Sequence, residues 1–173
     1  MIDTFRRAAE AGIDHIQIRE KALPAKYLID LAAAAVDAVK GAPTRIIINE
    51  RFDIALAAGA DGVHVTSTGL PLPIVRLHVG DRLSIGVSTH KASEVLAARD
   101  GGADYAYFGP VFSTPGKAAT ISLADLSDVC RKVWPFRVIA IGGIDAANFE
   151  SVLENGAAGF ATIRYLNDLL LGT

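Results

Sequence analysis

Residues 58–65 read Ala-Gly-Ala-Asp-Gly-Val-His-Val, a glycine-containing turn that leads directly into an apolar, β-branched run. Segments of the same kind occupy residues 11–14, 101–104 and 155–158, and each also precedes an apolar run. A glycine in the left-handed conformation commonly ends a helix. The glycines of these turns are therefore predicted to end helices immediately before strands, at Gly12, Gly59, Gly102 and Gly156.

Outward from these turns, short apolar runs alternate with helix-like stretches along the whole chain. Strands are predicted at residues 15–19, 44–49, 62–66, 83–88, 105–109, 137–141 and 159–164. Helices are predicted at residues 4–11, 25–40, 91–100, 123–133 and 146–154. Parallel strands need a crossover helix between them, so this alternation predicts a parallel sheet.

The strands wind continuously without a chain reversal, which favours a closed barrel over a doubly wound open sheet. The predicted fold is α/β, a TIM-type (β/α)8 barrel formed as a single domain by residues 1–173. The chain starts with a helix and provides one strand too few, so we expect the first strand to lie upstream and to be missing. The alternative is a sheet with two open edges, which favour association. Another part of the protein or a partner must cover the gap left by the missing strand. A homo-oligomer is one possible assembly.

The composition points to an ordered domain that handles small molecules. Hydrophobic residues make up 51% of the chain and charged residues 21%, which is typical of a globular protein. The net charge of −2 provides no basic field, so neither nucleic acid nor an anionic membrane is an expected partner. A single cysteine, Cys130, excludes an internal disulfide. With no apolar leader at the N-terminus and no run long enough to span a bilayer, a cytoplasmic location is expected.

Polar and glycine-rich segments follow nearly every predicted strand, and in such barrels the strand ends form the active site. Gly142-Gly143 follows the penultimate strand, and Thr162-Ile163-Arg164 ends the last one. Loops at these two places often bind phosphate, since glycine admits close backbone N–H groups and a following helix adds its dipole. Arg164 could add a fork of donors. The alternative is that the glycines only form a tight turn before a helix capped by Asp145.

Three cations, Arg19, Lys21 and Lys117, lie on segments that face the predicted site. Converging cations suggest a second and more highly charged anion, such as a diphosphate. The alternative is that Glu20 or Glu50 pairs with them on the surface, which contributes little.

The histidines are less informative. His64 lies between two valines and is predicted to be structural. His90 follows a strand and is the one reasonable acid/base candidate, with a packing role as the alternative. A serine hydrolase is not supported, because the Gly-x-Ser-x-Gly elbow does not occur.

Six collinear segments resemble the thiamine-phosphate synthase family, which includes a thiazole tautomerase branch. They span the whole chain in the family's order, at residues 17–21 (Gln-Ile-Arg-Glu-Lys), 48–51, 59–64, 86–88, 109–117 and 140–144. The resemblance implies a synthase that joins hydroxymethylpyrimidine diphosphate to thiazole phosphate and releases diphosphate with the help of Mg²⁺. It places Ser88 beside the pyrimidine. It assigns the diphosphate side to Gln17, Arg19, Lys21, Asn49, Thr114 and Lys117, and the thiazole phosphate to Gly143, Ile163 and Arg164.

The chain departs from the family pattern at its metal ligands. Asn49-Glu50 stands where the synthases carry Asn-Asp, and Thr66-Ser67-Thr68-Gly69 replaces a loop that carries the second carboxylate. Mg²⁺ is usually held by one or two carboxylates together with substrate phosphates, so Glu50 is the remaining metal candidate. The histidine of the tautomerase branch falls at Pro110.

Three functions are therefore considered. A thiamine-phosphate synthase, a transferase, agrees with the diphosphate-side residues. A thiazole tautomerase, an isomerase, needs no metal and would use His90 or Glu50 as its base. A non-catalytic protein that binds thiazole phosphate or thiamine phosphate agrees with the departures at both sites.

Overall fold

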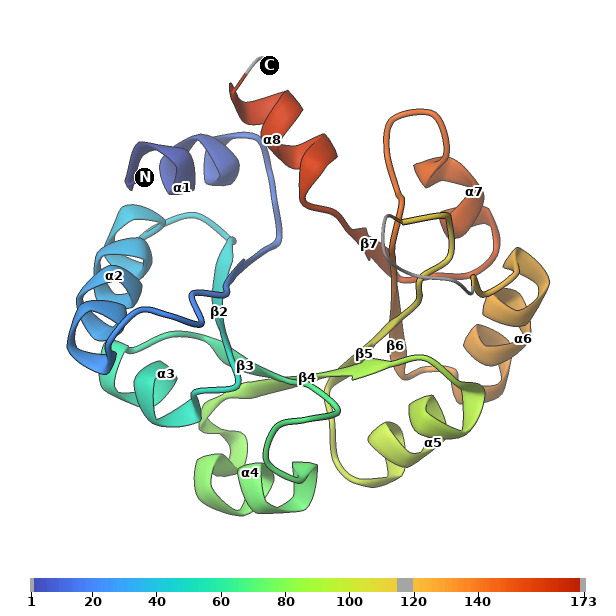
Figure 1. The fold of residues 1–173 in the computed structure, drawn as a ribbon, viewed down its shortest axis with the longest axis horizontal. Helices are drawn as coiled ribbons and strands as arrows, with labels where there is room; N and C mark the ends of the chain where they lie inside the picture. The colour runs from blue at the N-terminus through green and yellow to red at the C-terminus, as the bar shows by residue number, and fades with distance from the viewer. Residues whose placement is uncertain (1, 115–119, 172–173) are drawn as a thin grey trace. The chain divides into compact units, whose positions relative to one another are not determined.

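The computed structural model describes residues 2–114 and 120–171 of the 173-residue chain (Figure 1). Its seven strands form a sheet in the order β1-β2-β3-β4-β5-β6-β7, which is their order along the chain. Contacts within the chain define two compact units, residues 1–85 and 86–173. The interpretation of the chain as a single domain stays a prediction.

The strands are β1 (His15–Ile18), β2 (Arg45–Asn49), β3 (Gly62–Val65), β4 (Ser84–Thr89), β5 (Tyr105–Phe108), β6 (Arg137–Ile141) and β7 (Gly159–Ala161). The helices are α1 (Ile2–Glu10), α2 (Ala25–Ala38), α3 (Phe52–Ala58), α4 (Leu72–Val79), α5 (Ala92–Asp100), α6 (Leu123–Val133), α7 (Phe149–Glu154) and α8 (Arg164–Leu171). A short 3₁₀ helix, η1 (Gly80–Arg82), follows α4.

In the first unit, β1, β2 and β3 pair in parallel, with Ile48 opposite both Ile18 and Val63. The central strand, β2, is buried on both faces, as its uninterrupted run of isoleucines predicts for a parallel sheet. Helices α2 and α3 run side by side along this group of strands (Figure 1). The strands are thereby held so that β1 and β2 end at the same edge of the sheet.

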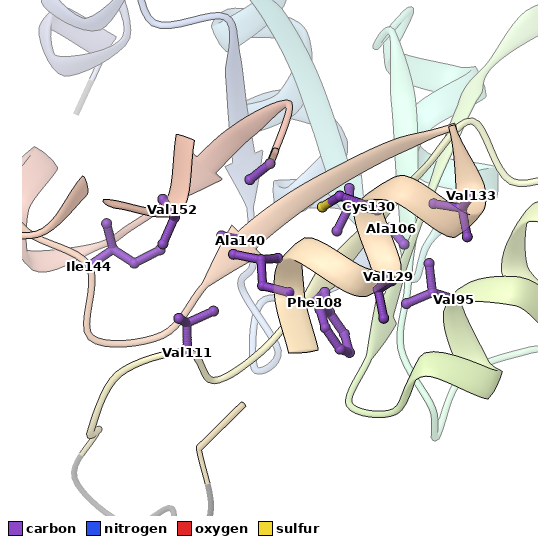
Figure 2. Close-up of a cluster of buried hydrophobic side chains, with 13 residues drawn as sticks. Val95, Ala106, Phe108, Val111, Val129, Cys130, Val133, Ala140, Ile144 and Val152 are labelled. Atoms are coloured by element: carbon purple, nitrogen blue, oxygen red, sulfur yellow. The ribbon is translucent and has the colours of Figure 1, made fainter. Parts of the chain in front are cut away.

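In the second unit, β4 to β7 pair in parallel and pack against α5, α6 and α7. Figure 2 shows the buried cluster between sheet and helices, in which Val129 and Cys130 of α6 approach Phe108 of β5 and Ala140 of β6. Helix α6 begins where its apolar stripe begins, because the Ser122 hydroxyl accepts a hydrogen bond from the backbone N–H of Asp125, 3.1 Å away. This cluster fixes the strands β5 and β6, and the glycine pair Gly142-Gly143 follows the carboxyl end of β6.

The other face of β5 carries two tyrosines. Ala106 and Phe108 belong to the cluster, so strand alternation turns Tyr105 and Tyr107 to the opposite face. Gly86 of β4 makes room for one ring, because a Cβ at that position would lie 2.2 Å from Cζ of Tyr105. Burial raises the pKa of Tyr105 well above its ordinary value, so the phenol stays protonated.

The turns that predicted the fold have the predicted conformation. The backbone φ angles are positive at all four glycines, with 76° at Gly12, 70° at Gly59, 88° at Gly102 and 88° at Gly156. The described residues hold the seven predicted strands, each within a few residues of its expected place. No helix among the described residues is long and apolar enough to cross a bilayer.

Two boundaries near the predicted phosphate site were wrong. The last strand ends at Ala161 rather than at Arg164, and Arg164 instead begins helix α8. The helix predicted at residues 146–154 begins only at Phe149, because residues 145–148 form a polar turn closed by side-chain hydrogen bonds. The glycine pair is therefore followed by this turn and not directly by a helix.

Candidate functional site

In the first unit, a cavity of about 290 Å³ opens between the segments that follow β1 and β2. Three of the predicted site residues, Lys21, Asn49 and Glu50, line it together. Buried Ile18 and Leu28 form its apolar side. The remaining lining residues are Glu20, Leu23 and Arg51.

Two predicted residues of the diphosphate side contact each other directly. The Gln17 side-chain amide donates a hydrogen bond from Nε2 to Oδ1 of Asn49 over 3.0 Å, which fixes the orientation of the Asn49 amide. Asn49 is only 8% exposed and lines the cavity as a buried polar residue. Arg19 follows β1, is exposed, and lies outside the set of lining residues, so its role stays a prediction.

Glu50 has an unusual backbone conformation at the end of β2. Its φ angle is 61°, a left-handed value that is uncommon for a residue other than glycine and often accompanies a functional constraint. The Thr66 hydroxyl donates a hydrogen bond to Oε1 of Glu50, and the Thr68 hydroxyl lies 3.2 Å from that of Thr66. Gly69 allows this approach, since a Cβ there would lie 3.2 Å from Oε1. The threonine-rich turn therefore packs on the carboxylate of Glu50.

This arrangement tests whether Glu50 suits a metal ion. Among residues 2–114 and 120–171, no three histidine, cysteine, aspartate or glutamate side chains gather as a metal-binding group. Glu50 offers one carboxylate with hydroxyl oxygens beside it, and Mg²⁺ prefers six oxygen ligands. The residues fit Mg²⁺ only when a ligand such as a diphosphate supplies further oxygens.

Arg51 lines the cavity and was not singled out from the sequence. Its guanidinium donates from Nε and Nη2 to the two carboxylate oxygens of Asp53, over 2.8 and 2.6 Å. These hydrogen bonds are the main cause that lowers the pKa of Asp53 below its ordinary value. The signal that could have found Arg51 is its position in the Asn-Glu-Arg run at the end of a strand.

In the second unit, the segment at residues 141–144, called the glycine loop below, contains Gly142 and Gly143. All four of its backbone carbonyls accept hydrogen bonds. Ile141 and Gly142 accept from the backbone N–H groups of Val111 and Phe112, each over 3.0 Å. Gly143 accepts from Nδ2 of Asn148 over 3.0 Å. The carbonyl of the next residue, Ile144, accepts from the Thr162 hydroxyl over 2.9 Å.

These hydrogen bonds fix where the amides of the loop point. In a planar trans peptide the N–H points away from the C=O of the same peptide unit. The carbonyls of Gly142 and Gly143 are held by Phe112 and Asn148. The N–H groups of the same two peptide units, which belong to Gly143 and Ile144, therefore point away from these partners. The Thr162 bond also joins the end of β7 to the glycine loop, which shows that the two predicted phosphate-binding segments adjoin. Ile163 and Arg164 follow and are exposed.

His90 is held by one of its ring nitrogens. Its Nδ1 lies 2.5 Å from the carbonyl oxygen of Gly109, and because a carbonyl only accepts, Nδ1 carries the proton. The backbone N–H of His90 donates to Oε2 of Glu94 over 2.7 Å. The ring therefore links the end of β4 to the segment after β5, in agreement with the packing alternative. Any proton transfer by this histidine would use Nε2.

The remaining predicted residues are placed as follows. Ser88 lies in β4 opposite Tyr107 in the strand register. The Thr114 hydroxyl donates to the carbonyl of Phe112 over 3.2 Å. Lys117 lies outside the described residues. His64 is 1% exposed, and burial lowers its pKa to about 4, so it is neutral near pH 7, as expected for a structural histidine.

Comparisons with known proteins agree on one family. The thiamine monophosphate synthase family matches residues 1–166. A thiamine-phosphate synthase of Methanocella arvoryzae is 41% identical over 161 residues, which cover 91% of this chain and 76% of that protein. The thiamine-phosphate synthase of Gloeobacter violaceus is 39% identical over 165 residues, and the match covers 95% of this chain but only 48% of that longer protein. The structure of thiamine phosphate pyrophosphorylase from Pyrococcus furiosus superposes with a TM-score of 0.87 at 31% identity, covering 98% of this chain and 80% of that one.

Parallel strands in chain order, alternating helices and polar strand ends define an enzyme of the (β/α) barrel class, and the structural match confirms this fold class. Within that class, the chain belongs to the thiamine monophosphate synthase family. The relatives support the synthase interpretation, a transferase of thiamine biosynthesis, over the tautomerase and the non-catalytic alternatives.

Proposed function

We propose that this chain couples hydroxymethylpyrimidine diphosphate with thiazole phosphate to give thiamine phosphate and diphosphate. The observation that carries the proposal is the glycine loop, in which hydrogen bonds from Phe112 and Asn148 hold two successive carbonyls and thereby orient the adjoining amides, in a chain whose relatives are named thiamine-phosphate synthases. In the reaction, the bond between the pyrimidine methylene carbon and the diphosphate oxygen breaks. The thiazole nitrogen then forms the new bond to that carbon, and diphosphate leaves.

On the thiazole side, we propose that the phosphate lies on the N–H groups of Gly143 and Ile144. Backbone amides that are already oriented bind an anion without reorganisation, which favours such loops as phosphate sites. Exposed Arg164 would contribute its fork of donors from the start of α8, with Ile163 beside it.

On the diphosphate side, we propose that Lys21 and the Asn49 amide, oriented by Gln17, hold the leaving group in the cavity after β1 and β2. The family resemblance also assigns Arg19, Thr114 and Lys117 to the leaving group and Ser88 to the pyrimidine ring. Cations at a departing diphosphate matter because they stabilise charge that grows in the transition state. We also propose that this reaction takes place in the cytoplasm, as expected from the sequence.

Glu50 would hold a Mg²⁺ ion that arrives with the diphosphate, and Asn49 lies beside it in the chain. When bound, the ion would neutralise part of the charge on the leaving group. The chain's own part is to present one carboxylate, held in a fixed orientation by Thr66.

Titration of Mg²⁺ into the ligand-free protein should show no site tighter than about millimolar, because one carboxylate is too few without substrate oxygens. Isothermal calorimetry checks this, with a second titration in the presence of inorganic diphosphate, where tighter binding is expected. The Glu50→Gln variant serves as the control and should weaken only the second titration. A tight site in the ligand-free protein would contradict the assignment.

The Gly143→Ala variant should bind thiazole phosphate about tenfold more weakly. A Cβ at this position would lie 2.6 Å from the carbonyl oxygen of Ser113, and the φ angle of 64° is strained for alanine, so the loop must shift away from its amide-presenting form. Calorimetric titration with thiazole phosphate measures the effect. Gly12→Ala is the matched control, because Gly12 has a positive φ with open space around it, so that variant should lose stability but keep its affinity. Unchanged affinity in Gly143→Ala would move the phosphate to another place.

The direct test of the proposed function is to incubate the protein with both substrates, with and without Mg²⁺, and to look for thiamine phosphate by chromatography. Formation of the product is expected with Mg²⁺ present. A protein that binds both substrates but forms no product would overturn the proposal, and a parallel assay of thiazole isomerisation would then identify the tautomerase.

A further inference from the structure

Asn148 makes two hydrogen bonds that close the turn after the glycine loop. Its Nδ2 donates to the carbonyl of Gly143, and its Oδ1 accepts from the backbone N–H of Asp145, both over 3.0 Å. We propose that Asn148 is a positioning residue for the phosphate of the thiazole substrate, because it holds the Gly143–Ile144 peptide in the orientation that presents the Ile144 N–H. This inference rests on the proposed function.

The glycine pair explains why the loop needs such a residue. Gly142 and Gly143 both have positive φ angles, 101° and 64°, and glycine changes its backbone conformation at little steric cost. A peptide next to two glycines can rotate easily unless its carbonyl is held. The Gly142 carbonyl is held by the main chain at Phe112, whereas the Gly143 carbonyl is held by the side chain of Asn148. The hydrogen bond that holds the Gly143–Ile144 peptide therefore comes from a side chain and not from the main chain.

The chemistry of the two bonds selects an asparagine. One partner is a carbonyl, which needs a donor, and the other is an N–H, which needs an acceptor, and a side-chain amide offers both. An aspartate at this position would keep the acceptor but would place a carboxylate oxygen opposite the Gly143 carbonyl. Repulsion between these two oxygens would turn the peptide away.

The local structure fixes Asn148 itself. Its backbone N–H donates to the carbonyl of Asp145 over 3.3 Å, and its carbonyl accepts from the Ser151 hydroxyl over 2.7 Å. Oδ1 of Asp145 in turn accepts from the backbone N–H of Ala147 over 2.9 Å. The Asn148 side chain is thus presented to the loop by an ordered turn at the start of α7.

The test compares the Michaelis constants of the two substrates in the full-length chain. Asn148→Asp and Asn148→Ala should each raise KM for thiazole phosphate by about threefold to tenfold, the usual effect of losing one hydrogen bond. KM for the pyrimidine diphosphate should change by less than about twofold, since the proposal assigns this peptide to the thiazole phosphate alone. A residue with a merely structural role would change both constants, or would lower turnover without this difference.

Asn155→Asp is the matched control. Asn155 lies at the opposite end of α7, and its Nδ2 donates to the carbonyl of Ser151 over 2.8 Å, so the control removes the same kind of bond from the same helix. It should leave both Michaelis constants unchanged. Calorimetric titration of thiazole phosphate into each variant provides a second measurement that does not depend on turnover.

The outcomes separate this inference from the function on which it rests. If the parent protein binds thiazole phosphate and Asn148→Asp binds it equally well, the role of Asn148 is wrong while the proposed function stands. An equal loss of affinity in Asn155→Asp would also overturn that role. If the parent protein neither binds thiazole phosphate nor forms thiamine phosphate, the proposed function fails, and the inference about Asn148 fails with it.

Discussion

Replacing Lys117 with alanine is expected to lower the turnover of the coupling reaction by about two to three orders of magnitude. A lysine beside the leaving diphosphate acts mainly in the transition state, where negative charge grows on the departing oxygen. Substrate binding should therefore change much less than kcat. Steady-state kinetics with both substrates, followed by detection of thiamine phosphate, measures the two effects separately.

His90→Ala and Glu50→Gln are the companion variants that separate the synthase from the tautomerase. The ring of His90 already uses Nδ1 to hold the Gly109 carbonyl. Its loss should loosen the segment after β5 but should otherwise lower the turnover of the coupling reaction only slightly. In a tautomerase the slow step is a proton transfer from carbon, and loss of the base would cost about two to four orders of magnitude. A nearly silent Lys117→Ala in the coupling assay, combined with a large loss of His90→Ala or Glu50→Gln activity in the isomerisation assay, would contradict the synthase assignment.

Much of the fold could be predicted because its signals are local. A glycine that ends a helix needs a positive φ whatever surrounds it, and Gly59 and Gly102 could therefore be assigned from four-residue segments. The uninterrupted isoleucines of β2 likewise predict a strand buried on both faces. Helices α3, α4 and α8 were not predicted, since each is only seven or eight residues long.

The site was harder to predict because its geometry depends on contacts between distant segments. Lys21, Asn49 and Glu50 could be named as polar strand ends, and the structure places them around one cavity. The left-handed conformation of Glu50 and its hydrogen bond from Thr66 have no signal in the sequence. From the sequence, the threonine-rich turn shows only that a carboxylate of the family pattern is missing. Asn148 was missed for a similar reason, because its partners become visible only when the turn is folded.

The free energy of unfolding should fall by about 3 kcal/mol between pH 7.5 and pH 4 through His64 alone. Burial lowers the pKa of His64 to about 4 in the folded chain, whereas the ordinary value of 6.5 applies to the unfolded chain. Between these two values the unfolded chain binds a proton that the folded chain does not bind. Stability is therefore fully present above pH 6.5 and is lost as the pH falls toward 4.

Chemical denaturation at a series of pH values measures this dependence, and the His64→Gln variant isolates it from the carboxylates that titrate in the same range. The variant should be less stable than the parent at pH 7.5, because glutamine fills the buried site less well. Its stability should fall less steeply below pH 6.5, since glutamine does not titrate. His78→Gln is the control for the exchange of a histidine for glutamine, because His78 is exposed. Parallel curves for the parent and His64→Gln would show that His64 is not the group responsible.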